Sequence, residues 1–124
     1  MTARILVVDD NATNLKLASD VLEMEGYVVD RAVDAEQARR MIDGRAPDLI
    51  LMDVALPGMD GLTLTRKLKA DPTTRSIPVV ALTAFAMKGD EEKAMEAGCD
   101  GYIAKPIDTR KLPETLARIL ARRR

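Results

Sequence analysis

The sequence contains no histidine and no tryptophan, and it has a single cysteine, Cys99. Without imidazole, the chain cannot use a histidine as general base, metal ligand or phosphoryl carrier. One thiol excludes an intrachain disulfide, and nothing near Cys99 has the spacing of a metal site. Any chemistry that the chain performs must therefore depend on carboxylates, hydroxyls and amines.

Strong net charge and long hydrophobic runs are also missing. A formal net charge of −1 gives no long-range attraction to nucleic acid or to anionic lipid. No apolar run approaches the roughly 20 residues of a membrane span, and the N-terminus lacks the basic-then-apolar layout of a secretion signal. We therefore expect a cytoplasmic protein that binds neither nucleic acid nor membranes.

Length and composition are those of one globular domain. With 124 residues, 47% of them hydrophobic and 31% charged, the chain has enough apolar surface for one core and is unlike a disordered protein. We predict a single domain over residues 1–124 with no output domain of its own. We expect a monomer or a weak dimer.

Short apolar runs alternate with helical segments along the whole chain. Continuous apolar runs are typical of parallel strands that are covered on both faces. We predict strands at residues 3–8, 27–31, 47–52, 77–82 and 101–104. We predict helices at residues 11–25, 35–44, 61–70, 86–97 and 108–122. This alternation indicates an α/β domain with a parallel sheet and right-handed crossovers.

Local signals mark several helix ends. Gly26 suits the left-handed residue that follows a helix. Asp34, with Gln37 three positions later, has the pattern of an N-cap and its reciprocal partner. Pro113 falls inside the last predicted helix, so we expect the first turn of that helix to be irregular or to start late.

Polar residues stand where the predicted strands end. Asp9 and Asp10 follow the first strand, Asp53 follows the third, Thr83 follows the fourth and Lys105 follows the fifth. In open α/β sheets, ligands bind beyond the carboxyl ends of the strands. We therefore expect these five side chains to converge on one crevice.

Three carboxylates in one crevice require a cation. Two carboxylates about 4 Å apart repel each other by roughly 4 kcal/mol at an effective dielectric constant near 20. Oxygen-only ligands in a site that keeps waters suit Mg²⁺ better than Zn²⁺. With Lys105 as a second positive charge, such a site would neutralise a phosphoryl group and leave one carboxylate oxygen free to attack it, as in aspartyl-phosphate chemistry.

Each of these residues also has an ordinary structural interpretation. Asp10 or Asn11 could simply cap the first helix, and Asp53 could serve the Pro-Gly turn that follows it. Thr83 could be another helix cap, and Lys105 a solvated strand end. The combination favours a site, because turn chemistry alone does not bring matched charges from four strands to one edge.

Four segments resemble the signature segments of response-regulator receiver domains of two-component signalling. They are ILVVDDN at 5–11, LILMDVALPGMDG at 49–61, VVALTAFA at 79–86 and YIAKP at 102–106. The resemblance covers essentially the whole chain and is strongest to stand-alone cell-cycle regulators of the DivK type. It implies a flavodoxin-like, doubly wound sheet of five parallel strands in the order 2-1-3-4-5, flanked by five helices. The strand order comes from the resemblance and not from the apolar pattern.

The resemblance also implies a role for each site residue. Asp53 would accept the phosphoryl group, and Asp9 and Asp10 would hold Mg²⁺ together with Asp53 and the main-chain carbonyl of Ala55. The remaining implied roles belong to residues within or directly after the fourth and fifth strands. Thr83 and Lys105 would contact the phosphoryl group, Lys105 would be joined to Pro106 by a cis peptide bond, and Tyr102 would be the switch aromatic that follows Thr83.

By the same resemblance, the chain is a phosphorylated switch and not an enzyme with a separate substrate. A sensor histidine kinase or a histidine phosphotransfer protein would donate the phosphoryl group, docking on the first helix near Asn14 and Leu15. The surface of helix four, strand five and helix five would then control a downstream protein. Phe85 and Ala55 lie where access of hydrolytic water is set.

Other classes fit less well. A haloacid-dehalogenase-type phosphatase needs a second aspartate two residues after the nucleophile, where this chain has Ala55. A nucleotide- or flavin-binding module needs a glycine-rich loop after the first strand, where Asp9 and Asp10 would repel phosphate. A receiver that is never phosphorylated and acts as an interaction scaffold remains the alternative, although such proteins usually lack one of the key polar residues.

Overall fold

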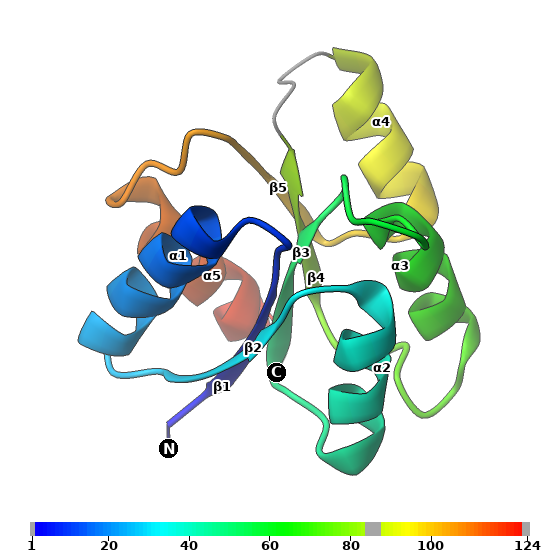
Figure 1. The fold of residues 1–124 in the computed structure, drawn as a ribbon, viewed down its shortest axis with the longest axis horizontal. Helices are drawn as coiled ribbons and strands as arrows, with labels where there is room; N and C mark the ends of the chain where they lie inside the picture. Colours follow the sequence, from blue (N-terminus) through cyan, green and yellow to red (C-terminus); the bar gives the residue numbers. More distant parts are fainter. Residues whose placement is uncertain (1, 84–87, 123–124) are drawn as a thin grey trace.

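The computed structural model describes residues 2–83 and 88–122, and its strands form one parallel sheet in the order β2-β1-β3-β4-β5 (Figure 1). The strands are β1 (Arg4–Val8), β2 (Val28–Ala32), β3 (Leu49–Asp53), β4 (Val79–Thr83) and β5 (Gly101–Ala104). The helices are α1 (Ala12–Met24), α2 (Ala35–Gly44), α3 (Gly61–Ala70), α4 (Lys88–Ala97) and α5 (Lys111–Arg122). The predicted fold class and strand order are confirmed. None of these helices is long and apolar enough to cross a bilayer.

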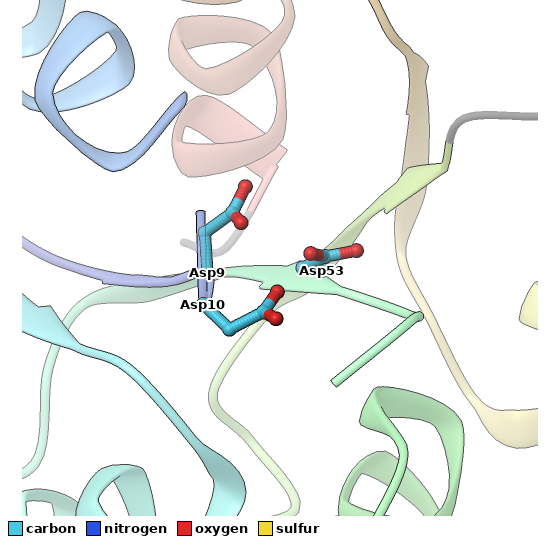
Figure 2. A group of neighbouring side chains, drawn as sticks. All are labelled: Asp9, Asp10 and Asp53. Carbon is cyan, nitrogen blue, oxygen red and sulfur yellow. The ribbon is translucent and has the colours of Figure 1, made fainter. Parts of the chain in front are cut away.

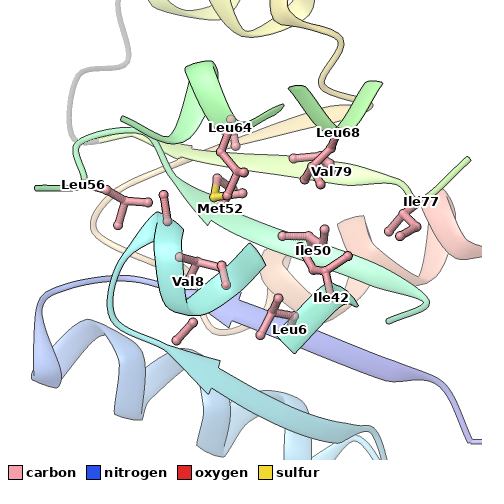
Figure 3. Close-up of a cluster of buried hydrophobic side chains, with 14 of the residues drawn as sticks. Leu6, Val8, Ile42, Ile50, Met52, Leu56, Leu64, Leu68, Ile77 and Val79 are labelled. Atoms are coloured by element: carbon pink, nitrogen blue, oxygen red, sulfur yellow. The ribbon is translucent and has the colours of Figure 1, made fainter. Parts of the chain in front are cut away.

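Helices cover both faces of the sheet, which explains the unbroken apolar runs of its strands. Alternate strand residues point to opposite faces. On one face, residues such as Leu6, Ile50 and Met52 pack with α2, α3 and α4 (Figure 3). On the other face, neighbours such as Ile5 and Leu51 pack with α1 and α5. The sheet is thus the middle layer of three, and its carboxyl edge is left free for polar residues.

The helix signals lie where the sequence placed them. Asn11 caps α1 by accepting a hydrogen bond from the Asn14 amide, and Gly26 follows that helix with φ of 94°. Asp34 caps α2 through the Gln37 amide, while the Gln37 side chain accepts from the Val33 amide. The Gln37 side chain therefore binds the amide of the residue before the cap and not the amide of Asp34 itself.

Several boundaries differ from the prediction by one to three residues, and three of these differences have local reasons. Strand β2 begins at Val28, because the Tyr27 amide is used in the turn after α1. Strand β4 begins at Val79, because the Ile77 amide bonds back to Thr74. Helix α5 begins late, at Lys111, so that Pro113 occupies its first turn, where a missing N–H removes no helical hydrogen bond. Predicted helix residues 86 and 87 lie outside the described residues.

The thiol of Cys99 is buried under α3 and gives a testable pH prediction. Burial raises its pKa from 9.0 to about 11, while the hydrogen bond to Thr65 acts in the opposite direction. At about pH 8 the thiolate fraction is therefore about 100-fold lower than that of an unshifted thiol. We expect an aromatic disulfide reagent to label native Cys99 at least about 100-fold more slowly than the urea-unfolded chain, with the rate rising towards pH 11. Similar labelling rates for native and unfolded protein would contradict this expectation.

Candidate functional site

Three carboxylates meet at the carboxyl edge of the sheet. Asp9 and Asp10 directly follow β1, and Asp53 is the last residue of β3. Strands β1 and β3 are neighbours in parallel register, with Val8 beside Met52, so the residues that follow also lie together. Figure 2 shows the three side chains around one space, and one oxygen from each lies within 4.8 Å of the others. The predicted convergence of these aspartates is therefore observed.

The three aspartates differ in burial and in bonding. Asp9 and Asp53 are buried, whereas Asp10 is exposed. One oxygen of Asp9 accepts a hydrogen bond from the Asn11 amide at 2.9 Å, and one oxygen of Asp53 accepts from the Ala55 amide at 3.0 Å. Asn11 caps α1, so Asp10 is not needed for that purpose. The capping interpretation thus applies to Asn11 and not to Asp10, whose carboxylate belongs to the acidic cluster.

Lys105 joins the two buried carboxylates. Its Nζ lies 3.3 Å from Asp9 Oδ2 and 3.2 Å from Asp53 Oδ2. Burial lowers the pKa of Lys105, but the hydrogen bond and charge of Asp53 and the charge of Asp9 outweigh it, so the pKa is raised and the ammonium is retained. The peptide bond between Lys105 and Pro106 is cis.

The single ammonium of Lys105 does not fully offset the negative charge of the three carboxylates. Burial raises the pKa of Asp9 above its ordinary value, and the charge of Asp53 adds to this rise, whereas the Asn11 amide and Lys105 lower it. Although Asp9 Oδ2 lies near Lys105, it is buried and makes no hydrogen bond of good geometry. A buried carboxylate oxygen without a hydrogen bond is costly and is suited to a cation.

The donor set fits a hard divalent cation. All three carboxylates offer oxygen, and the described residues place no imidazole or thiolate among them. Oxygen donors of this kind are typical of Mg²⁺ and Ca²⁺ sites rather than of zinc sites. The exposed Asp10 leaves one side of the cluster open to water or to a phosphate oxygen. The cluster could therefore hold a divalent cation.

Thr83 and Tyr102 lie on the other side of Asp53, near α4. Thr83 is buried at the end of β4, and Tyr102 is half-buried on β5. Both residues line a cavity of about 30 Å³, together with Ala81, Ala94 and others. This volume is large enough for one water molecule.

Two expectations about neighbouring residues need correction or lie outside the described residues. Leu15 was expected on a docking surface of α1, but it is buried in the core, because it belongs to the apolar stripe of that helix. Asn14 is half-buried, and the exposed leucine of α1 is Leu17. Ala55 is exposed beside Asp53. Phe85, the other residue expected to control access of water, lies outside the described residues.

Comparisons with known proteins agree with this architecture. The sequence profile of the response regulator receiver domain matches residues 5–117. The polar-differentiation response regulator DivK of Brucella ovis is 46% identical over 116 residues, which cover 94% of each chain. Two solved structures superpose closely. A protein of Chloroflexus aurantiacus has a TM-score of 0.95 at 36% identity, covering 98% of this chain and 99% of its own. A CheY-like receiver domain protein of Methanospirillum hungatei has a TM-score of 0.91 at 31% identity, covering 99% and 97%.

Proposed function

The chain belongs to the response regulator receiver domain family, and from this premise we propose that it is a phosphorylatable signalling switch that accepts a phosphoryl group on Asp53. One observation carries the proposal. Lys105 Nζ contacts both Asp9 and Asp53 within 3.3 Å, next to the exposed carboxylate of Asp10. The site thus consists of two buried carboxylates and one ammonium, and it is open on one side. It can receive an anionic group only when the negative charge of its carboxylates is offset.

In this proposal each residue has a distinct task. A carboxylate oxygen of Asp53 attacks phosphorus, the bond between phosphorus and the donor's leaving atom breaks, and the leaving group departs with its electron pair. The Ala55 amide orients Asp53 by donating to its Oδ1. Lys105 neutralises part of the charge on the phosphoryl oxygens. Held by Asp9, Asp10, Asp53 and the Ala55 carbonyl, Mg²⁺ would supply charge neutralisation for the carboxylates and the phosphoryl group.

The switching surface lies next to this site. We assign Thr83 to hydrogen bonding with the phosphoryl group, and Tyr102 to a change of position that follows it. The small cavity that both residues line supports this assignment. Phosphorylation adds about −1.5 to −2 charges near neutral pH, which can shift a surface between two states only where contacts differ between them. The surface of α4, β5 and α5 would then bind its downstream protein differently.

The donor must bring the histidine that this sequence lacks. A sensor histidine kinase or a histidine phosphotransfer protein would meet this need, and a small acyl phosphate is a simple substitute for either. Leu17, which is 37% exposed on α1, is a better candidate for contact with the donor than the buried Leu15. A phosphotransfer profile against the host's histidine kinases would identify the physiological partner.

Intact-mass spectrometry tests the proposal directly. We expect incubation with a small acyl phosphate and Mg²⁺ to add the mass of one phosphoryl group, and we expect chelation of the metal to prevent the addition. A chain whose mass does not change under either condition would instead be an unphosphorylated scaffold. In that case, partner binding would not respond to the phosphodonor.

A further inference from the structure

The first residue of α3 lies directly against the main chain of the proposed phosphoacceptor. Gly61 is buried, and a Cβ atom placed on it would overlap the carbonyl oxygen of Asp53 and lie 2.9 Å from Met52 Cγ. The backbone of Gly61 does not have a positive φ, unlike those of Gly26 and Gly58. Glycine is therefore required here by close approach and not by an unusual backbone conformation.

The peptide group between Asp53 and Val54 is held from both sides. Its N–H, on Val54, donates to the Leu82 carbonyl of β4 at 3.0 Å. In a planar trans peptide the carbonyl points the opposite way, and here it points to Gly61. Movement of this peptide away from α3 would push its N–H against the Leu82 carbonyl, which already lies at 3.0 Å. The peptide cannot move towards α3 unless that helix is displaced.

Helix α3 is itself tied to the same segment. The Gly61 amide donates to the Val54 carbonyl at 3.1 Å, and the buried Thr65 hydroxyl donates to the Gly61 carbonyl at 2.8 Å. Leu64 and Leu68 anchor the helix in the core under the sheet. The start of α3 therefore braces the end of β3, and only hydrogen atoms separate the two backbones at residue 61.

We infer that Gly61 is a positioning residue for Asp53, because its missing side chain lets α3 hold the Asp53–Val54 peptide in one orientation. That peptide carries the Asp53 side chain at one end and leads through Val54 to the Ala55 amide, which donates to Asp53 Oδ1 at 3.0 Å. A rotation of the peptide would move both the carboxylate and the amide that orients it, and would change the 3.2 Å contact with Lys105. The inference rests on the proposed function, since it concerns the same phosphoryl transfer.

The test compares Gly61→Ala with Gly44→Ala. Gly44 is also a helical glycine, but a Cβ atom there would have nothing within 4 Å. The measured quantity is the initial rate of phosphorylation by a small acyl phosphate at saturating Mg²⁺, well below the melting temperature. We expect Gly61→Ala to reduce this rate by up to about 100-fold, as displacements of about 1 Å do in catalytic sites. We expect Gly44→Ala to keep the rate of the wild-type chain.

A destabilised control separates positioning from loss of stability. Leu68→Ala removes a buried side chain in the last turn of α3, far along the helix from Asp53. We expect it to lower the melting temperature while the phosphorylation rate of the folded protein stays within about twofold of wild type. A folded Gly61→Ala protein with the wild-type rate, or a Leu68→Ala protein with the same loss of rate as Gly61→Ala, would overturn the inference.

A double variant separates overlap with the backbone from crowding against a side chain. Met52→Ala with Gly61→Ala removes the crowding against the Met52 side chain and keeps the overlap with the Asp53 carbonyl. Met52 is fully buried, so its truncation lowers stability further, and the rate of each variant is divided by its folded fraction, measured by circular dichroism. On that basis we expect the double variant still to phosphorylate slowly. Recovery of the full rate would overturn the inference, because side-chain crowding would then explain the whole effect. A wild-type chain that takes up no phosphoryl group would refute the proposed function instead, whatever the glycine variants do.

Discussion

We expect Asp53→Asn to abolish incorporation of the phosphoryl group and to leave the protein folded. The substitution keeps the shape of the side chain but replaces the nucleophilic carboxylate with a neutral amide. Lys105 retains its contact with Asp9 at 3.3 Å, so the half-buried ammonium keeps one carboxylate partner. Because the cluster loses one of three mutually repelling charges, we expect the free energy of unfolding without divalent cations to be no lower than that of the wild-type chain.

The measurement is intact mass after incubation with a small acyl phosphate and Mg²⁺. The matched control is Asp30→Asn, which removes a carboxylate of β2 that pairs with Arg4 away from the site. We expect the control to gain one phosphoryl group as the wild-type chain does. If Asp53→Asn still gained that mass, another residue would be the acceptor, and the role assigned to Asp53 would be wrong.

The second large effect concerns the divalent cation. We expect saturating Mg²⁺ to stabilise the folded chain by about 2.7 kcal/mol at a free metal concentration of about 100 times Kd, because the unfolded chain does not gather the three carboxylates. The gain arises where Asp9, which is fully buried, and Asp53 face each other with one ammonium between them. Chelation of the metal should reverse it completely.

Thermal or urea unfolding at fixed ionic strength measures this stabilisation, and an equivalent concentration of monovalent salt controls for screening. Asp10→Asn is the informative variant, since Asp10 is exposed and does not cap α1. We expect it to leave the metal-free stability nearly unchanged and to remove most of the response to Mg²⁺. Equal stabilisation of the wild-type and Asp10→Asn chains would show that the metal binds elsewhere.

The acidic cluster shows which parts of the site sequence patterns can predict. The residues that follow the apolar runs of β1 and β3 were identifiable because a parallel sheet brings the carboxyl ends of its strands to one edge. The neighbouring positions of β1 and β3 were not contained in the apolar pattern, since any strand order would bury those runs equally well. That order came from resemblance to a family, and the structure confirms it.

Individual side chains show where patterns fail. No pattern in the sequence singles out Lys69, near the end of α3. In the structure its Nζ donates to the carbonyls of Arg75 and Ile77 and to Asp100, joining three segments. Leu15 was named by resemblance as a candidate docking residue, whereas its place on the apolar stripe of α1 favours the burial that the structure shows. Gly61 stands at the end of the signature segment 49–61 and at the start of a predicted helix, and nothing in the sequence indicates how closely α3 approaches Asp53.

The sequence by itself determined the α/β class, the approximate position of most strands and helices, the cap of α2, and the carboxylates that the site contains. These features depend on residues that are near one another in the chain, or on the regular spacing of apolar residues along it. Only the tertiary structure decided that one ammonium lies between Asp9 and Asp53 and that α3 presses on the Asp53 peptide. Such contacts join residues distant in sequence at specific distances, and those distances depend on how whole elements pack.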